Sequence, residues 1–177
     1  MTKLEEVDTN HKPFDHLVMT ITPVSTPEDR IMAESLLRAY GQHLETEGID
    51  LCLTGLESDI ANLSNPDTPL LLAKNEQNET LGCVSVKRRT LGTEVVAEMK
   101  RLYVLPEHRA SGAGRALVEA VIAWARGQHL AAVVLDTEPE KMVAAGRLYR
   151  SLGFQHTERF NSNAVPHVAF LRLDLAP

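Results

Sequence analysis

Glu98–Gly114, with the sequence EMKRLYVLPEHRASGAG, is the most informative part of the chain. Its first half is extended and largely apolar, and it stops before a proline, as strands commonly do. Its second half contains a glycine-rich turn, Arg109-x-x-Gly112-x-Gly114, after which apolar residues recur at helical spacing as far as Gly127. The segment therefore predicts a strand, a tight turn and an amphipathic helix in direct succession.

Strand and helix patterns alternate on both sides of this segment. In chain order, the predicted elements are a strand at His16–Val24, a helix that begins at Thr26, a helix at Leu56–Leu63, strands at Pro69–Asn75, Thr80–Arg89 and Thr93–Pro106, a helix at Gly112–Gly127, a strand at Leu130–Thr137, a helix at Met142–Phe154, and strands at Gln155–Phe160 and His167–Leu175. The order β-α-α-β-β-β-α-β-α-β-β predicts one mixed α/β (α+β) domain at residues 16–177. The polar residues 1–15 predict a flexible leader.

The composition limits the classes of protein to which the chain can belong. Its 177 residues suit one domain, and 24 Asp and Glu against 18 Lys and Arg give a net charge of −6. An acidic surface disfavours nucleic acid and mildly favours cationic substrates such as amines. No apolar run approaches the ~20 residues that span a bilayer, so no membrane partner is expected.

The cysteines and histidines carry no metal or redox pattern. The two cysteines, Cys52 and Cys83, form no C-x-x-C pair, and the seven histidines show no zinc-binding spacing. Cys83 lies in an apolar strand, where a core position is expected. These features predict a cytoplasmic protein with reduced thiols and no metal.

The glycine-rich turn predicts an anion site. Glycines let backbone N–H groups approach a ligand, and a helix N-terminus adds unpaired donors and partial positive charge, which together usually hold phosphate. Arg109 and Arg115 would add charge-assisted contacts. A P-loop is excluded because no G-x-x-x-x-G-K-[ST] is present, and a dinucleotide fingerprint is excluded because Leu117 stands where its third glycine belongs. A structural turn without a ligand stays an alternative.

The whole arrangement resembles the GNAT superfamily of N-acetyltransferases. The glycine-rich turn matches the family's [RQ]-x-x-G-x-[GA], and Glu98–Val104 (E-x-K-R-L-Y-V) and Leu148–Phe154 (L-Y-x-x-L-G-F) are also typical of it. The resemblance extends from Thr20 to Leu175. It implies a twisted, mostly antiparallel sheet of about seven strands with helices on both faces. It also implies direct transfer of an acetyl group from acetyl-CoA to a primary amine, expected to be a small molecule, in a ternary complex.

The resemblance further implies which residues hold the cofactor. The pantetheine arm would pair with the strand backbone at Leu102, Tyr103 and Val104. The pyrophosphate would lie on the turn and the first helical residues, which are Arg109, Ala110, Ser111, Gly112, Ala113, Gly114 and Arg115. Two positions depart from the family's pattern: Met142 replaces an asparagine that binds the pantetheine arm in many members, and Ala110 replaces a common glycine.

Two side chains are candidates for the chemistry. An alkylammonium with a pKa near ~10.4 must lose a proton before it attacks, and the departing thiolate must gain one. The resemblance implies that Tyr149 is the general acid beside the thioester, although its position alone also suits the core. Glu98 is the candidate base, because positions four apart in a strand put it on the face of Leu102, and several family members have a glutamate here. Its alternatives are a structural carboxylate paired with Lys100 or Arg101, or one that binds the substrate's ammonium.

Other functions stay open at this point. The same scaffold would also serve as an acyl-CoA-binding sensor with little turnover, or as an enzyme that acetylates a protein or peptide amine. A binder of a simple nucleotide is a further alternative. The regions that select the acceptor contain no readable motif. A homodimer is one expected assembly, since family members are often dimers.

Overall fold

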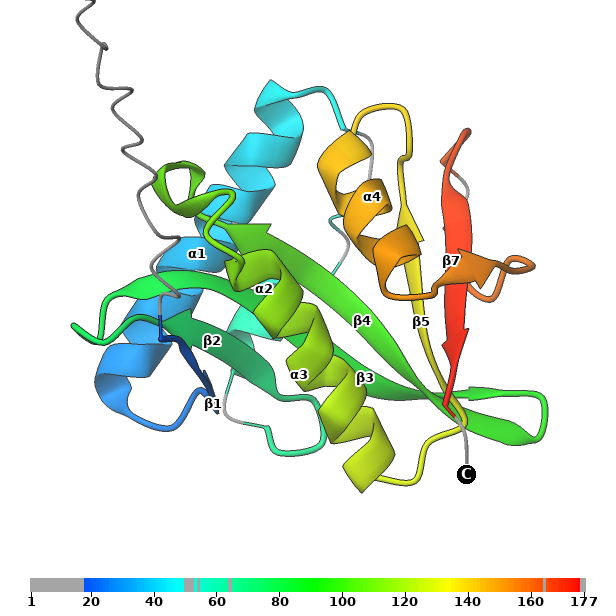
Figure 1. The fold of residues 1–177 in the computed structure, drawn as a ribbon, viewed down its shortest axis with the longest axis horizontal. Coiled ribbons are helices and arrows are strands. Elements are labelled where there is room, and N and C mark those ends of the chain that lie inside the picture. Colours follow the sequence, from blue (N-terminus) through cyan, green and yellow to red (C-terminus); the bar gives the residue numbers. More distant parts are fainter. Residues whose placement is uncertain (1–17, 50–52, 54, 64, 164, 176–177) are drawn as a thin grey trace, which may run out of the picture.

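The computed structural model describes residues 18–49, 53, 55–63, 65–163 and 165–175. One twisted sheet of seven strands runs through it (Figure 1). Its strands are β1 (Thr20–Pro23), β2 (Leu70–Lys74), β3 (Thr80–Leu91), β4 (Glu94–Val104), β5 (Ala132–Thr137), β6 (Gln155–His156) and β7 (Ala169–Asp174). They lie in the order β1-β2-β3-β4-β5-β7-β6, and every neighbouring pair is antiparallel except β4 and β5, which are parallel. The predicted mostly antiparallel sheet is confirmed.

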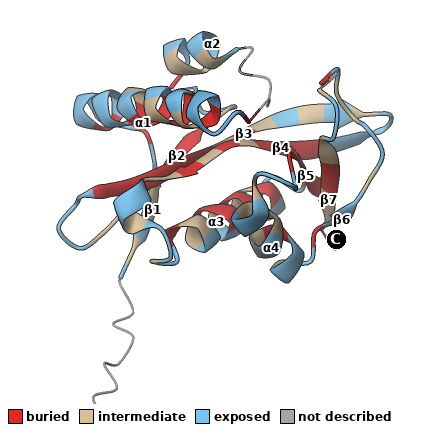
Figure 2. Ribbon diagram, turned by 90° about the horizontal axis from the view of Figure 1, so that it is seen from above, coloured by how far each residue is buried: buried red, intermediate tan, exposed pale blue. Residues whose placement is uncertain are grey.

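Helices cover both faces of the sheet, as predicted (Figure 2). They are α1 (Pro27–Thr46) and α2 (Leu56–Ala61) on one face, and α3 (Ala113–Gly127) and α4 (Val143–Ser151) on the other. A 3-10 turn at Pro106–His108 connects β4 to α3. The predicted order of strands and helices is found in this single mixed α/β domain. The leader predicted at residues 1–15 lies outside the described residues.

The start of α1 is fixed by a capping box and by an ion pair to the sheet. The Thr26 hydroxyl accepts a hydrogen bond from the Asp29 backbone N–H at 3.1 Å, and the Asp29 carboxylate accepts one from the Thr26 N–H at 3.2 Å. Lys74 of β2 donates to the same carboxylate at 2.5 Å. This side-chain bond is the main reason that the pKa of Asp29 falls to about 2. The pair therefore joins α1 to the sheet.

Each face of the sheet has its own hydrophobic core. On one side, the apolar stripe of α3 packs on the central strands together with Tyr149 and Phe154. On the other side, the buried leucines of α1 pack on β2 and β3, and Cys83 is fully buried among them, which confirms its expected core position. The sheet therefore separates two helical layers.

A β-bulge interrupts β4 near its C-terminal end. Cys83 of β3 pairs with Tyr103, but Ser85 pairs with Lys100, so β4 has one residue more than β3 across this interval. Arg101 lies within the bulge and has a left-handed backbone, with φ of 57°. Opposite the bulge, β3 has Gly82, where a Cβ would lie only 2.3 Å from the Tyr103 carbonyl oxygen. A glycine is therefore required at that close approach.

The bulge corrects the prediction that Glu98 and Leu102 share a strand face. Met99 and Leu102 both pack in the core on the α3 side, so Glu98, which precedes Met99, points to the opposite face. The extra residue of the bulge shifts the alternation by one, and positions four apart then lie on opposite faces. Glu98 is also the last residue of β4 that pairs with β5, since the two strands pair only at Ala97–Val133 and Glu98–Val134.

The last strands differ from the prediction in extent. The strand expected at Gln155–Phe160 is limited to β6. Thr157 still donates a backbone hydrogen bond to Phe170 of β7 at 2.9 Å, and farther along, Asn161 and Asn163 bond Asp136 of β5 instead. The final strand begins at Ala169 rather than His167, which has a left-handed backbone with φ of 66°. At the other end, β1 begins at Thr20, and residues 16 and 17 of the strand predicted there lie outside the described residues.

Candidate active site

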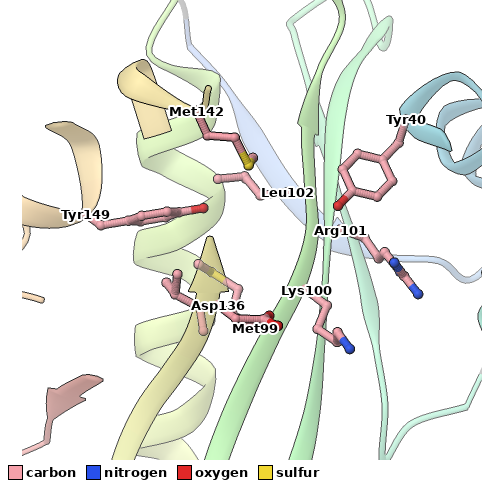
Figure 3. Close-up of a pocket in the computed structure, with 9 residues that line it drawn as sticks. Tyr40, Met99, Lys100, Arg101, Leu102, Asp136, Met142 and Tyr149 are labelled. Carbon is pink, nitrogen blue, oxygen red and sulfur yellow. The ribbon is translucent and has the colours of Figure 1, made fainter. Parts of the chain in front are cut away.

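A pocket lies where β4 and β5 diverge beyond Glu98 (Figure 3). Its lining residues come from four elements and one loop, and they are Tyr40, Met99, Lys100, Arg101, Leu102, Leu135, Asp136, Met142 and Tyr149. Tyr40 from α1 and Tyr149 from α4 enter from opposite faces of the sheet, and both hydroxyls point into the gap (Figure 3). The parting of the two strands therefore brings the helical layers together at one site.

Tyr149, the predicted acid, lines this pocket. Its ring is buried against Phe154, with the centroids 5.7 Å apart. Burial raises the pKa of its hydroxyl well above the ordinary value of 10, and the nearby Tyr40 and Asp136 add to the shift because a second negative charge is disfavoured there. The hydroxyl therefore stays protonated and can act as a proton donor.

Tyr40 is a pocket residue that the sequence pattern did not reveal. Its place on the apolar stripe of α1 predicts only a core position, and most of its ring is indeed buried. Its pKa is raised by burial, an effect that the neighbouring Arg101 opposes. The Arg101 guanidinium lies over the Tyr40 ring, 5.9 Å from the centroid, and pairs with Asp59 of α2 at 3.0 Å. Arg101 thus fixes one wall of the pocket.

Asp136 is a second pocket residue that the sequence pattern did not reveal. It occupies the end of an apolar strand, where its carboxylate is the only departure from the pattern of residues 130–135. The side-chain amides of Asn163 and Asn161 both donate to its Oδ2, at 2.8 and 3.3 Å. Its carboxylate faces the gap between β4 and β5 (Figure 3). A carboxylate in an otherwise apolar strand was visible in the sequence. Its place in the pocket follows only from the arrangement of β4 and β5.

Glu98, the predicted base, is fully buried and is not among the residues that line the pocket. Arg89 donates to its Oε2 at 2.9 Å, while Lys87 and Lys100 lie 3.6 and 3.9 Å from its oxygens. Within the described part of the chain, its Oε1 has no hydrogen-bond partner. Of the pairings considered for Glu98, the structure has the one with Lys100, whereas Arg101 pairs with Asp59.

A longer groove adjoins the pocket and shares Tyr40, Leu102 and Met142 with it. Most of the predicted cofactor residues line this groove: Leu102, Tyr103, Val104, Arg109, Ala110, Gly112, Gly114 and Arg115. Ser111 and Ala113 do not line it. The Ser111 hydroxyl instead accepts a bond from the Ala113 N–H at 3.3 Å, and Ala113 is buried in the core. The groove therefore unites the two segments that the resemblance assigned to one cofactor.

The groove has the chemistry of a site for an extended, phosphate-bearing ligand. Gly112, with φ of 92°, precedes the N-terminus of α3, whose first N–H groups and partial positive charge favour an anion. Arg109 lies 3.3 Å from the His43 ring, and Arg115 donates to Ser151 at 2.7 Å. Beyond Glu98, β4 also has an edge that β5 leaves unpaired, where an extended ligand can bond the backbone. These features fit acetyl-CoA.

The described residues contain no group of three or more His, Cys, Asp or Glu side chains placed to hold a metal ion. Among the helices of the same residues, none combines the length and the apolar character that crossing a membrane requires.

The parted strands, the glycine-rich turn at the start of α3 and the tyrosine near the junction are the arrangement expected of an acyltransferase of the N-acetyltransferase type. Residues 31–154 match the acetyltransferase (GNAT) family, and the chain belongs to that family.

Relatives agree with this assignment over most of the chain. An uncharacterized N-acetyltransferase of Schizosaccharomyces pombe is 33% identical over 162 residues, which cover 89% of this chain and 96% of that protein. Aminoglycoside N(6')-acetyltransferase type 1 of Stenotrophomonas maltophilia is 33% identical over 127 residues, or 69% of this chain and 77% of that protein. Arabidopsis thaliana NAA60 in complex with acetyl-CoA has the same fold, with a TM-score of 0.66, 19% identity, and coverage of 89% of this chain and 99% of that chain.

Proposed function

We propose that the protein transfers an acetyl group from acetyl-CoA directly to a primary amine of a small molecule, in a ternary complex. The observation that carries the proposal is the junction of two cavities. The groove with the predicted cofactor residues and the pocket that contains Tyr149 lie side by side and share Tyr40, Leu102 and Met142 in their walls. A thioester at the end of the groove would therefore meet an amine in the pocket.

The parting of β4 and β5 supports the first half of this proposal. The unpaired edge of β4 would bond the pantetheine arm, and the start of α3 with Arg109 and Arg115 would bind the pyrophosphate. When bound, acetyl-CoA supplies the activated acyl group. A backbone N–H of β4 beside the carbonyl would stabilise the oxyanion that forms on attack.

Tyr149 would complete the reaction as the general acid. Its raised pKa keeps the hydroxyl protonated at neutral pH, and its position at the junction suits donation to the departing thiolate. Glu98 as the base remains a prediction, and its surroundings favour a different role. The Glu98 carboxylate is fully buried, lies outside the pocket lining, and has Lys87, Arg89 and Lys100 within 3.9 Å, so it is placed as a counterion for these cations.

The relatives support an amine acceptor without fixing its size. One relative is named for an aminoglycoside, which is a small polyamine, and Arabidopsis NAA60 shares only the fold. The pocket is a narrow gap between two strands, closed on its two sides by Tyr40 and Tyr149, which favours a small molecule over a folded protein surface. The presence of Tyr149 in the pocket lining argues against a sensor without turnover.

Calorimetric titration with acetyl-CoA, with ADP as the control, tests the cofactor assignment. Tight one-to-one binding of acetyl-CoA together with weak binding of ADP is expected. Release of free thiol from acetyl-CoA in the presence of an amine then tests the transfer. A folded protein that binds acetyl-CoA but releases thiol with no amine would be a sensor, and one that prefers ADP would be a nucleotide binder.

A further inference from the structure

Positive charge gathers on the sheet face beside the pocket. Lys87, Arg89 and Lys100 surround the single carboxylate of Glu98, so three cations face one buried anion. Their side chains are 41%, 30% and 23% exposed, whereas Glu98 is not exposed at all. Solvent and ligands therefore meet the cations and not the carboxylate. This part of β3 extends beyond the cover of α1 and α2 (Figure 2), although the Phe160 ring lies against Arg89, 5.9 Å from its guanidinium carbon.

The bulge connects this cationic surface to the pocket. It places Lys100 and Arg101 on the same side of the sheet, although they are consecutive. Arg101 is engaged by Asp59 at 3.0 Å. Lys100 lines the pocket, and its ammonium lies 3.9 Å from Glu98, beyond hydrogen-bond distance. Its ammonium therefore has capacity for a further anionic partner.

The opposite wall of the pocket presents a negative group. Asn163 and Asn161 both donate to Oδ2 of Asp136, and within the described chain no hydrogen bond occupies Oδ1. The two amides fix the direction of the carboxylate, which faces the gap (Figure 3). Asp136 shares the pocket with Tyr149, so an ammonium bound by Asp136 would lie where the acetyl group arrives.

We propose that the acceptor is a small amine that also bears a carboxylate, as an amino acid does. Asp136 binds the ammonium beside Tyr149, and Lys100, supported by Lys87 and Arg89, binds the carboxylate. This inference rests on the proposed function and narrows its substrate class. The acidic composition mildly favours cationic substrates, but the charge that lines this face is positive, and a ligand responds to the local field.

The proton movements balance with these residues. The ammonium gives one proton to Asp136, and the neutral nitrogen then forms a bond to the acetyl carbonyl carbon. As the C–S bond breaks, Tyr149 protonates the thiolate. The nitrogen loses its second proton to the Tyr149 oxygen through water, and Asp136 releases its proton to solvent. The products are an N-acetylated amine, CoA and one proton.

The test compares amino acids with their own carboxamides, by thiol release at saturating acetyl-CoA. The wild-type protein is expected to use an amino acid with a kcat/KM at least ~10-fold above that of its carboxamide, as for one charge-assisted contact. Lys100→Met should lower kcat/KM for the amino acid and leave kcat/KM for the carboxamide unchanged, so that the preference disappears. Arg126→Met, an exposed change on α3, is the control and should keep the preference.

The results separate a failure of the carboxylate inference from a failure of the proposed acetyltransferase function. Carboxamides or plain alkylamines used as well as amino acids by the wild-type protein would overturn the carboxylate inference and leave the acetyltransferase proposal intact. No thiol release with any amine would overturn the proposed function, and this inference with it. Because the wild-type comparison needs no variant, the test holds even if Lys100→Met does not fold.

Discussion

Tyr149 is held by packing in the place where the reaction needs a proton donor. We expect Tyr149→Phe to lower kcat by at least ~10²-fold, the usual contribution of a positioned acid, and to leave acetyl-CoA affinity nearly unchanged. The ring that packs on Phe154 is retained, so the melting temperature should change little. Steady-state rates, calorimetry and thermal melting measure the three quantities. An unchanged kcat would remove Tyr149 from the mechanism.

The raised pKa of Tyr149 also predicts a pH dependence. A tyrosine with its pKa above 10 is protonated throughout the neutral and mildly alkaline range, so its ability to donate is lost only at more alkaline pH. The kcat of the wild-type enzyme, measured up to pH 10 where the protein stays folded, should therefore show no alkaline fall from this residue. A fall near pH 8 that Tyr149→Phe abolishes would contradict the assignment.

Asp136 and Glu98 are both carboxylates near the junction, and their substitutions separate their roles. Asp136→Asn should lower kcat/KM by ~10²-fold or more and flatten the acid limb of its pH profile, because the group that takes the ammonium proton is lost. Glu98→Gln should leave the acid limb of the pH profile of kcat/KM unchanged. Its main effect should be a lower melting temperature, since three clustered cations lose their buried counterion. The opposite pattern would return the base role to Glu98.

At the scale of elements, the turn before α3 depends on a backbone that only glycine adopts easily. Gly112→Ala places a side chain at φ of 92°, a strain of ~1–2 kcal/mol that would distort the N–H groups facing the groove. Acetyl-CoA affinity should fall by about 10-fold in calorimetry. Gly92→Ala is the control: it imposes a left-handed backbone, φ of 59°, at the β3–β4 turn outside the groove. Equal loss of affinity in both variants would show a general destabilisation instead.

The junction of α1 with β2 predicts how acid affects stability. The pKa of Asp29 is about 2 in the folded protein against an ordinary 3.8, so the carboxylate stabilises the fold above pH 4. That contribution, about 2 kcal/mol at most, is lost as the pH falls from 4 through 2. Urea unfolding at pH 6 and pH 3 should show a smaller acid loss for Asp29→Asn than for the wild-type protein. Asp67→Asn, in an exposed turn, should behave as the wild type.

At the scale of the whole molecule, the order of elements was predictable and the contents of the pocket were not. Helical and strand periods and the glycine-rich turn are local signals, and they produced the expected order of elements, with the strand expected at Gln155–Phe160 shortened to β6. Tyr40 and Asp136 lie on apolar elements whose pattern indicates core, and only the parting of β4 from β5 brings them together. The face of Glu98 was mispredicted because one bulge residue reverses the alternation of the strand.

The parting of the strands has a consequence for motion as well as for chemistry. The groove is walled by α1 on one side and α4 on the other, two helices that belong to different layers and pack on different cores. A ligand in the groove therefore bridges the layers and adds contacts that the sheet alone does not provide. Hydrogen–deuterium exchange of the C-terminal half of α1 and of α4 should slow together when acetyl-CoA binds, although the two helices are distant in the sequence.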